Sequence, residues 1–234
     1  MPDTSPITTT LMTTPGMTET ALVRLLAWLS PAFPTGGFAY SHGLEWAVQA
    51  GDVRDEAGAL DWITDILSHG AGWSDAILLR HAYRARDDYE LQEIAGLAAA
   101  SLTSLERQQE SCGQGSAFLN AAAAWGTERL GGVAERLPYA VAVGAVSALH
   151  GVDEDAACIG FLQAFAANLV SASIRLVPLG QSAGLRILAA LEPTILSLAA
   201  STRDSGLNDI GGCAFRSDIA AMRHETQYTR LFRS

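Results

Sequence analysis

The sequence has no lysine. All 15 basic residues are arginine, 25 residues are acidic, and the formal net charge is −10. Without lysine there is no G-x-x-x-x-G-K-[ST] loop, the motif that holds nucleotide phosphates, so we do not expect the chain to hydrolyse GTP or ATP itself. The acidic balance disfavours a general nucleic-acid-binding protein, which needs a positive surface. It leaves room for a basic protein partner or a cation.

Cysteine is also scarce. Cys112, Cys158 and Cys213 are far apart and form no C-x-x-C pair, so neither a disulfide framework nor a zinc knuckle is indicated. A reducing cytoplasm is the expected compartment. No secretory signal peptide is visible, because the first basic residue is Arg24 and residues 1–20 contain no continuous apolar run. Eight threonines and three prolines in those residues predict a flexible leader over residues 1–17.

One long apolar stretch stands out among the segments that are present. Residues 159–181 read IGFLQAFAANLVSASIRLVPLGQ, and on a helix the polar members fall within one sector. These are Gln163, Asn168, Ser171 and Arg175. The stretch approaches the ~20 apolar residues of a membrane span, but a charge such as that of Arg175 in mid-span costs at least ~2.5 kcal/mol. We therefore predict a buried axial helix in a water-soluble bundle. Its polar sector should form an internal seam in which Arg175 meets a carboxylate or several carbonyls.

The remaining apolar residues also recur at helical spacing, without sustained alternation or hairpin turn pairs. Thr18, Asp55, Asp88 and Asp153 stand where helices begin, as capping or first-turn residues do. The pattern predicts an all-α fold: one domain over residues 18–208, a bundle of about ten helices around the axial helix.

Small and cyclic residues predict where individual helices start and break. Ser74 and Asp75 are expected to open a helix, and residues 113–115 (GQG) to interrupt one. Residues 131–132 (GG) predict a loop. Pro138 is expected as the first residue of a helix, and Pro193 as the start of a further turn.

The loop at residues 30–43, SPAFPTGGFAYSHG, combines two prolines and three glycines with three aromatic rings. A backbone stiffened in this way holds large side chains in fixed places. Either the loop binds something, or Phe33, Phe38 and Tyr40 simply fill the core from a connecting segment; the sequence supports both equally.

Residues 209–234 form a tail with a pattern of its own. Arg216, Arg223 and Arg230 recur every seven residues and would share one face of a helix. An acidic chain that gathers arginines at its end suggests docking to a partner. The alternative is a solvated terminal segment.

Candidate catalytic or metal-binding groups are few. His42 and Glu45 have a spacing compatible with two metal ligands, but two ligands do not make a site. Ser41 and His42 are adjacent, and because neighbouring side chains diverge they are not a nucleophile and its base. Cys112 is either a reactive thiol near a histidine or, more commonly, a small buried hydrophobe. No catalytic residue, metal centre or cofactor is therefore predicted.

Four segments resemble the UreF family of urease accessory proteins. They are residues 29–45 (LSPAFPTGGFAYSHGLE), the segment from Glu106-Arg107 to Gln114-Gly115, residues 175–181 (RLVPLGQ) and residues 228–234 (YTRLFRS). The resemblance runs in order from about Val23 to the C-terminus. The threonine-rich leader and the lack of lysine are departures from the family, so no role that depends on a lysine in relatives is carried over.

The resemblance implies a non-enzymatic chaperone in the nickel-dependent maturation of urease. Proteins similar to this chain are all-α, dimerise, bind the accessory protein UreD (also called UreH) and recruit the GTPase UreG, so that nickel passes to apo-urease. The expected partners are thus UreD, UreG, apo-urease through the complex, and a second copy of the chain, with neither nucleic acid nor a membrane.

The resemblance also implies a partner-binding surface around the tail. Arg230 and its neighbours should contact UreD and help to form the UreG site, with Tyr40 and Ser41 coupled to the tail. The full expected set is Tyr40, Ser41, Arg216, Arg223, Tyr228, Arg230, Leu231 and Phe232. The seam of Gln163, Asn168, Ser171 and Arg175 is either a water-filled path for the metal or a satisfied hydrogen-bond network in the core.

Two other functions compete with this one. The tail could supply an arginine finger, from Arg223 or Arg230, that regulates the UreG GTPase. A less favoured alternative is an all-α enzyme that uses His42, Glu45 or Cys112 in a pocket beside the axial helix.

Overall fold

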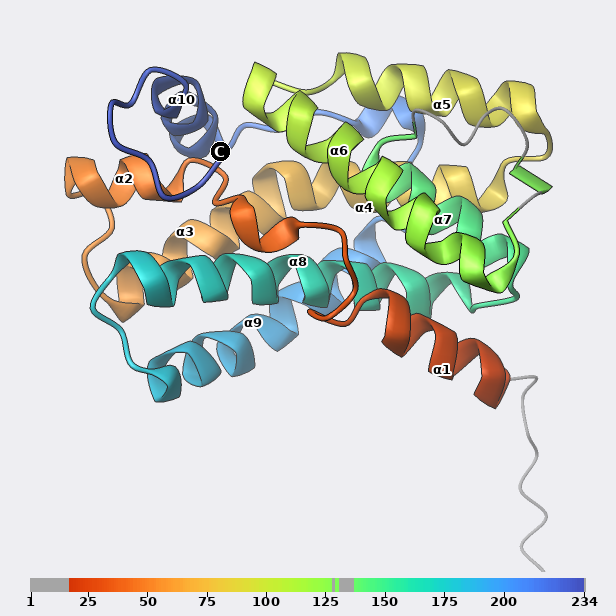
Figure 1. Cartoon of the computed structure of the whole chain (residues 1–234), viewed down its shortest axis with the longest axis horizontal. Helices are drawn as coiled ribbons and strands as arrows, with labels where there is room; N and C mark the ends of the chain where they lie inside the picture. The colour runs from red at the N-terminus through yellow and green to blue at the C-terminus, as the bar shows by residue number, and fades with distance from the viewer. Residues whose placement is uncertain (1–16, 128, 131–136, 234) are drawn as a thin grey trace, which may run out of the picture.

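The computed structural model describes residues 17–127, 129–130 and 137–233 (Figure 1). Within these ranges the chain forms ten α-helices and no strand, as the helical pattern predicts. The helices are α1 (Glu19–Trp28), α2 (Leu44–Ala50), α3 (Glu56–His69), α4 (Ala71–Arg84), α5 (Asp88–Ala100), α6 (Leu105–Ala122), α7 (Tyr139–Leu149), α8 (Glu154–Leu176), α9 (Gln181–Ser201) and α10 (Phe215–His224). Short 3₁₀ helices η1 (Gly37–Ala39), η2 (Ala123–Trp125) and η4 (Leu207–Asp209) lie in the connections. The predicted leader, apart from Met17, and the predicted loop at residues 131–132 lie outside the described residues.

The axial helix predicted from the sequence is α8. It runs along the bundle and contacts α1, α2, α3, α4, α7 and α9 (Figure 1). Asp153 caps it by accepting a hydrogen bond from the backbone N–H of Ala156 at 2.9 Å. The polar sector, however, is not internal, because Gln163, Ser171 and Arg175 are exposed and this side of α8 borders the 30–43 loop. The prediction of a buried seam is therefore wrong.

The most enclosed helix is α7, which packs against α4, α6 and α8. All its residues from Ala140 to Ser147 are buried, and all of them are small. A Cβ added at Gly144 would lie 2.2 Å from the carbonyl oxygen of Leu79, so the backbones of α7 and α4 are in direct contact. The small side chains of α7 thus allow its backbone to pack closely against that of α4.

Several predicted helix boundaries differ from the structure. α6 runs unbroken through residues 113–115, because Gly115 serves close packing: its added Cβ would lie 1.9 Å from the carbonyl oxygen of Leu137. α9 likewise continues through Pro193. α4 begins at Ala71, so Asp75 lies within the helix rather than at its start. Pro138 precedes the first residue of α7 by one position.

α8 and α9 are long and apolar enough to cross a membrane by length and composition alone. Within their most apolar windows, 50% of α8 and 39% of α9 is buried against the rest of the chain. Core helices of bundles have the same composition, so these two helices are weak evidence for a membrane.

Candidate functional site

The C-terminal segment is packed onto the folded body. α10 contacts α2 and α6, and the residues that follow it return along the start of α2 (Figure 1). Gly43, at φ +73°, makes this contact possible, because a Cβ there would lie 2.6 Å from the backbone nitrogen of Ala221. Ala220, Ala221 and His224 are buried. The alternative of a solvated terminal segment is therefore wrong for the described part of the tail.

Four charged side chains hold this segment in place, and we call them the tail cluster: Glu45, Glu106, His224 and Arg230. Glu45 accepts hydrogen bonds from the backbone N–H groups of Leu231 at 2.7 Å and Phe232 at 2.9 Å. The two ring nitrogens of His224 lie 2.8 Å from Glu106 and 3.1 Å from Glu45. The guanidinium of Arg230 donates to the other oxygen of Glu106 at 2.8 Å.

Every side chain in the tail cluster has a hydrogen-bond partner within the cluster. Both ring nitrogens of His224 face carboxylates, so the imidazole bridges Glu45 and Glu106. Buried charges that are paired and hydrogen-bonded in this way fix a local geometry, and here they position the chain from His224 to Phe232.

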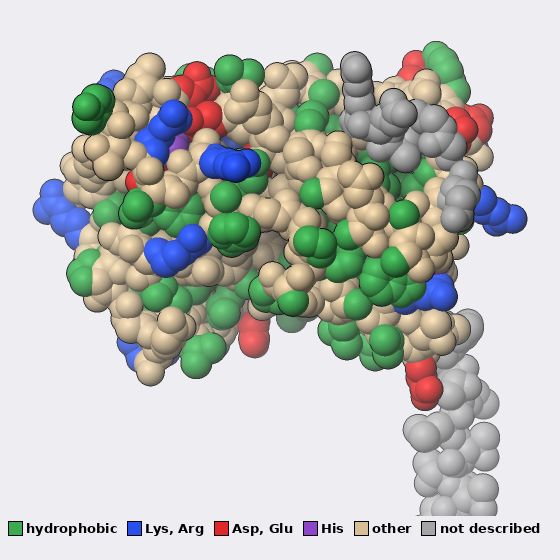
Figure 2. Space-filling view, in the orientation of Figure 1, with side chains coloured by type: hydrophobic (Ala, Val, Ile, Leu, Met, Phe, Trp, Pro, Cys, Tyr) green, Lys and Arg blue, Asp and Glu red, His purple; other side chains and the backbone are tan. Residues whose placement is uncertain are grey.

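The predicted tail residues do not all share one helix face. α10 ends at His224, so Arg230 is not part of the helix that carries Arg216 and Arg223. The guanidinium of Arg216 lies 5.3 Å from the ring centre of Trp62, and that of Arg223 lies 5.2 Å from the ring centre of Trp46. In the view of Figure 2, arginines gather on the side of the molecule where α10, α2 and the tail lie.

The last tail residues divide into exposed and buried side chains. Tyr228 is fully exposed and Leu231 is 77% exposed, whereas Phe232 is buried. The guanidinium of Arg175 lies 4.3 Å from the ring centre of Phe232. Tyr228 and Leu231 can therefore reach a partner directly, while Phe232 anchors the tail to the body.

Tyr40 and Ser41 are buried, so their side chains do not form part of the surface. Their loop nevertheless contacts the tail, because the carbonyl oxygen of Ala39 accepts a hydrogen bond from the backbone N–H of Arg233 at 2.7 Å. The hydroxyl of Ser41 also accepts from the backbone N–H of Glu45 at 3.3 Å. The structure thus brings Tyr40 and Ser41 next to the segment to which the sequence couples them.

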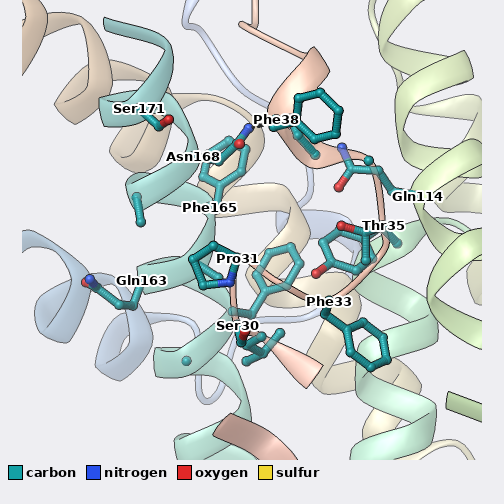
Figure 3. A pocket seen from close by; sticks show the side chains of 18 of the residues that line it. Ser30, Pro31, Phe33, Thr35, Phe38, Gln114, Gln163, Phe165, Asn168 and Ser171 are labelled. Atoms are coloured by element: carbon teal, nitrogen blue, oxygen red, sulfur yellow. Dashed lines mark hydrogen bonds between the residues drawn. The ribbon is translucent and has the colours of Figure 1, made fainter. Parts of the chain in front are cut away.

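A second feature is a cavity of about 830 Å³ between α1, the 30–43 loop, α6 and α8, which we call the recess (Figure 3). Its walls are mainly apolar and include Leu25, Leu29, Phe33, Phe38, Phe161 and Phe165. Asp75, Arg107, Glu110 and Gln114 are the charged and amide side chains that α4 and α6 contribute. In Figure 3, Gln114 and Asn168 lie on either side of the loop, and Gln163 points away from the centre.

The charges in the recess are unequally paired. Arg107 donates to Glu110, and the ring nitrogen Nε2 of His42 lies 2.9 Å from Glu110 and 2.8 Å from Arg107. Burial alone would raise the pKa of Glu110, but the charges and hydrogen bonds of Arg107 and His42 outweigh it and lower this pKa to about 2. Burial and the charge of Arg107 lower the pKa of His42, so its ring is neutral at pH 7. Asp75 differs, because burial raises the pKa of its carboxyl to about 6.

The polar sector of α8 meets the loop at the edge of this recess. The side-chain amide of Asn168 donates to the carbonyl oxygen of Gly37 at 2.8 Å, and Arg175 donates to that of Phe38 at 2.8 Å. Arg175 therefore meets carbonyl groups, as predicted, but at the surface and with no ion pair among the described residues. Gln163 and Ser171 line the recess itself.

The groups considered for enzyme chemistry do not converge. His42 turns toward Glu110, whereas Glu45 turns toward His224 and the tail amides. Burial raises the pKa of the Cys112 thiol, which disfavours the thiolate that a nucleophile requires. None of the three lines the recess. Among the residues that the structure describes, no group of three or more His, Cys, Asp or Glu side chains is arranged to hold a metal ion.

Sequence reasoning missed five of the residues that define these two places: Asp75, Glu106, Arg107, Glu110 and His224. Their partners lie up to 179 positions away, so spacing alone does not connect them. One signal was available in α6, where Glu106, Arg107, Glu110 and Gln114 recur at three- and four-residue intervals. This helix has few large apolar side chains, so its buried face had to be polar.

Comparison with known proteins agrees with the four segments noted in the sequence. The UreF family model matches residues 53–192. The chain is 51% identical over 228 residues to the urease accessory protein UreF of Rhodopseudomonas palustris (strain TIE-1), covering 94% of this chain and 95% of that protein. It is 52% identical over 221 residues to that of Bradyrhizobium sp. (strain ORS 278), covering 92% of each. It is 51% identical over 215 residues to that of Mesorhizobium japonicum (strain LMG 29417 / CECT 9101 / MAFF 303099), covering 92% of this chain and 96% of that protein. The chain therefore belongs to the UreF family of urease accessory proteins.

Proposed function

We propose that this chain is a scaffold in urease maturation with no catalytic activity of its own. It binds UreD (UreH) and recruits the GTPase UreG, so that nickel is inserted into apo-urease in a GTP-dependent step. It acts in the cytoplasm as a homodimer. Family membership supports a role in urease maturation and interaction with other urease accessory proteins.

The observation that carries the proposal is the exposed surface of α10 and the tail. Phe215, Ile219 and Met222 are exposed at helical spacing on α10, and Tyr228 and Leu231 are exposed beyond it. Aromatic side chains, Met and Arg are enriched at protein–protein interfaces. Contiguous exposed apolar side chains commonly mark such sites. Because the tail cluster holds this surface in a fixed conformation, a partner would not have to order it.

The test is complex formation with UreD and then UreG, measured by size-exclusion chromatography with light scattering. The variant replaces Tyr228 and Leu231 by Ala, because both side chains are exposed and their loss should leave the fold intact. Leu185→Ala, which changes a leucine that is 67% exposed on α9, is the control. We expect the control to form a complex of paired subunits and the double variant to fail. Complexes of equal stability for both variants would contradict docking at the tail.

Truncation after Phe215 is a less direct test of the same surface. It removes His224 and leaves Glu45 and Glu106 buried without their main partners. The truncated protein would therefore lose stability as well as the surface.

Regulation of the UreG GTPase is the second candidate function. The ion pair of Arg230 favours Arg223 as the arginine that would act on UreG. Arg230 is paired with Glu106, whereas Arg223 is exposed and makes no ion pair among the described residues. The effect of Arg223→Ala on the rate of GTP hydrolysis by UreG within the complex tests this role. An unchanged rate would leave the scaffold function alone.

The path for nickel along Gln163, Asn168, Ser171 and Arg175 stays a prediction. Asn168 and Arg175 hold the 30–43 loop through backbone carbonyls, which accounts for these two side chains without a metal. Urease activation that is unchanged when Gln163 and Asn168 are replaced by Leu, in a protein that still folds, would contradict the path.

A further inference from the structure

Asp75 is the one carboxylate of the recess without a hydrogen-bond donor among the described residues. Glu110, in the same recess, interacts with Arg107 and His42 and accepts a hydrogen bond from Gln114 at 3.0 Å. α4 fixes Asp75 at this place, because Gly72, one turn earlier, packs so closely on α3 that an added Cβ would lie 2.6 Å from the backbone of Leu67. Asp75 is half-buried and lines the recess, so a ligand in the recess can reach its carboxylate.

The recess as a whole carries one unbalanced negative charge. Asp75 and Glu110 are negative at pH 7, Arg107 is positive, and His42 is neutral. Because Arg107 interacts directly with Glu110, the excess negative charge is on Asp75. A ligand that completes this site must therefore bring one positive charge and at least one N–H donor.

The walls determine the rest of the ligand. Leu25, Leu29, Phe33, Phe161 and Phe165 give the recess an apolar lining. A cavity of about 830 Å³ lies within the range of small-molecule sites, which are mostly apolar with a few convergent polar groups. The described residues offer no group of three or more His, Cys, Asp or Glu side chains that could hold a metal ion.

We propose that the recess binds a small organic cation, an ammonium or amidinium group on an apolar body, with Asp75 as its counter-ion. The apolar body lies against the leucine and phenylalanine walls, and the cation donates to the Asp75 carboxylate. This site is separate from the tail surface and goes beyond the scaffold function, because the tail cluster contributes no residue to the recess.

The experiment measures binding of benzylamine to the full-length protein by isothermal titration calorimetry at pH 8. Benzyl alcohol, which has the same ring but no charge, is the matched ligand. The variants are Asp75→Asn and, as a control, Asp52→Asn, which changes an exposed carboxylate outside the recess. Circular dichroism verifies that both variants fold.

We expect benzylamine to bind the wild type and Asp52→Asn equally, and to bind Asp75→Asn at least tenfold more weakly. Benzyl alcohol should bind the wild type at least tenfold more weakly than benzylamine. Affinity for benzylamine should also fall between pH 7 and pH 5, because Asp75 becomes protonated while the amine stays charged.

Three results would overturn the proposal. The first is equal affinity of benzylamine for the wild type and Asp75→Asn, and the second is equal affinity of the wild type for the amine and the alcohol. The third is binding of Nα-acetyl-arginine amide without binding of benzylamine, which would assign the recess to a basic side chain of a partner protein.

Discussion

The tail cluster and the recess both contain carboxylates, but only the tail cluster pairs all of them. Glu45 and Glu106 face His224, Arg230 and two backbone N–H groups, so each carboxylate is hydrogen-bonded. Among the residues that the structure describes, Asp75 in the recess has no such donor, and burial raises its pKa. A balanced cluster holds a structure together, whereas an unbalanced one costs stability and is typical of a site that awaits a ligand.

The tail cluster and the recess also differ in how they are exposed to solvent. The tail cluster is covered by the chain that it holds, and what it presents to a partner is a set of exposed side chains around Tyr228 and Leu231. The recess is a cavity, and Asp75, Arg107 and Glu110 lie in its lining. The first geometry suits a protein partner and the second a small ligand.

The largest expected effect is that of Glu45→Ala. The substitution removes the acceptor of the Leu231 and Phe232 amides and one of the two carboxylates that face His224. Removing one partner of a buried charged pair typically costs about 3–5 kcal/mol, so the free energy of unfolding should fall by that amount. Urea denaturation measures it, with Glu192→Ala, an exposed glutamate of α9, as the control. A loss no larger than that of the control would show that the cluster does not hold the tail.

A smaller effect of opposite sign is expected from Asp75→Asn. The folded pKa of about 6 exceeds the ordinary value of 3.8, so ionised Asp75 destabilises the fold above pH 6, and this penalty disappears as the pH falls below 3.8. The substitution should therefore raise the free energy of unfolding at pH 8 by between about 1 and about 3 kcal/mol, with no gain at pH 4.

Glu110→Gln is the matched comparison within the same recess. The lowered pKa of Glu110 means that its ionised form stabilises the fold at neutral pH, and that this contribution is lost progressively as the pH falls from 4.5 to about 2. This substitution should destabilise the protein at pH 8. Denaturation curves that move in the same direction for Asp75→Asn and Glu110→Gln would erase the distinction between a paired and an unpaired carboxylate.

The smallest effect on stability is expected from Arg230→Ala. The side chain of Arg230 is 41% exposed, and partly exposed ion pairs contribute roughly 1 kcal/mol or less. Partner binding should suffer more, because truncation of a central interface arginine commonly costs about 2 kcal/mol or more. Comparing the unfolding free energy with the affinity for UreG in the complex separates the two. A loss of stability that exceeds the loss of affinity would assign Arg230 to the fold.

Much of the fold could be predicted from sequence because it depends on local signals. Thr18, Asp55 and Asp153 cap helices where the pattern places them, and the long apolar stretch is the helix with the most neighbours. The failures occurred where tertiary packing overrides local preference. Gly115 does not interrupt α6, because the absence of a side chain lets the segment before α7 pack directly against it. Pro193 lies inside α9.

The two sites were less predictable because they are made by contacts across the chain. The resemblance directed attention to the tail and to the 30–43 loop, which the structure brings together through Ala39 and Arg233. The sequence pattern marked Asp75 only as part of an expected helix start, because its lack of a donor among the described residues is a property of the folded surroundings. The polar sector of α8 was correctly grouped, but its environment was not, since periodicity alone does not say which neighbour covers a face.

The most direct test of the account is amide hydrogen exchange, resolved by NMR, in the isolated chain. If the tail cluster preforms the docking surface, the amides of Leu231 and Phe232 should be protected, because both donate to Glu45. The amide of Thr229, which makes no backbone hydrogen bond among the described residues, should exchange freely. Glu45→Ala should abolish the protection of the first two. Free exchange at Leu231 and Phe232 in the wild type would contradict the claim that the chain holds its own tail in place.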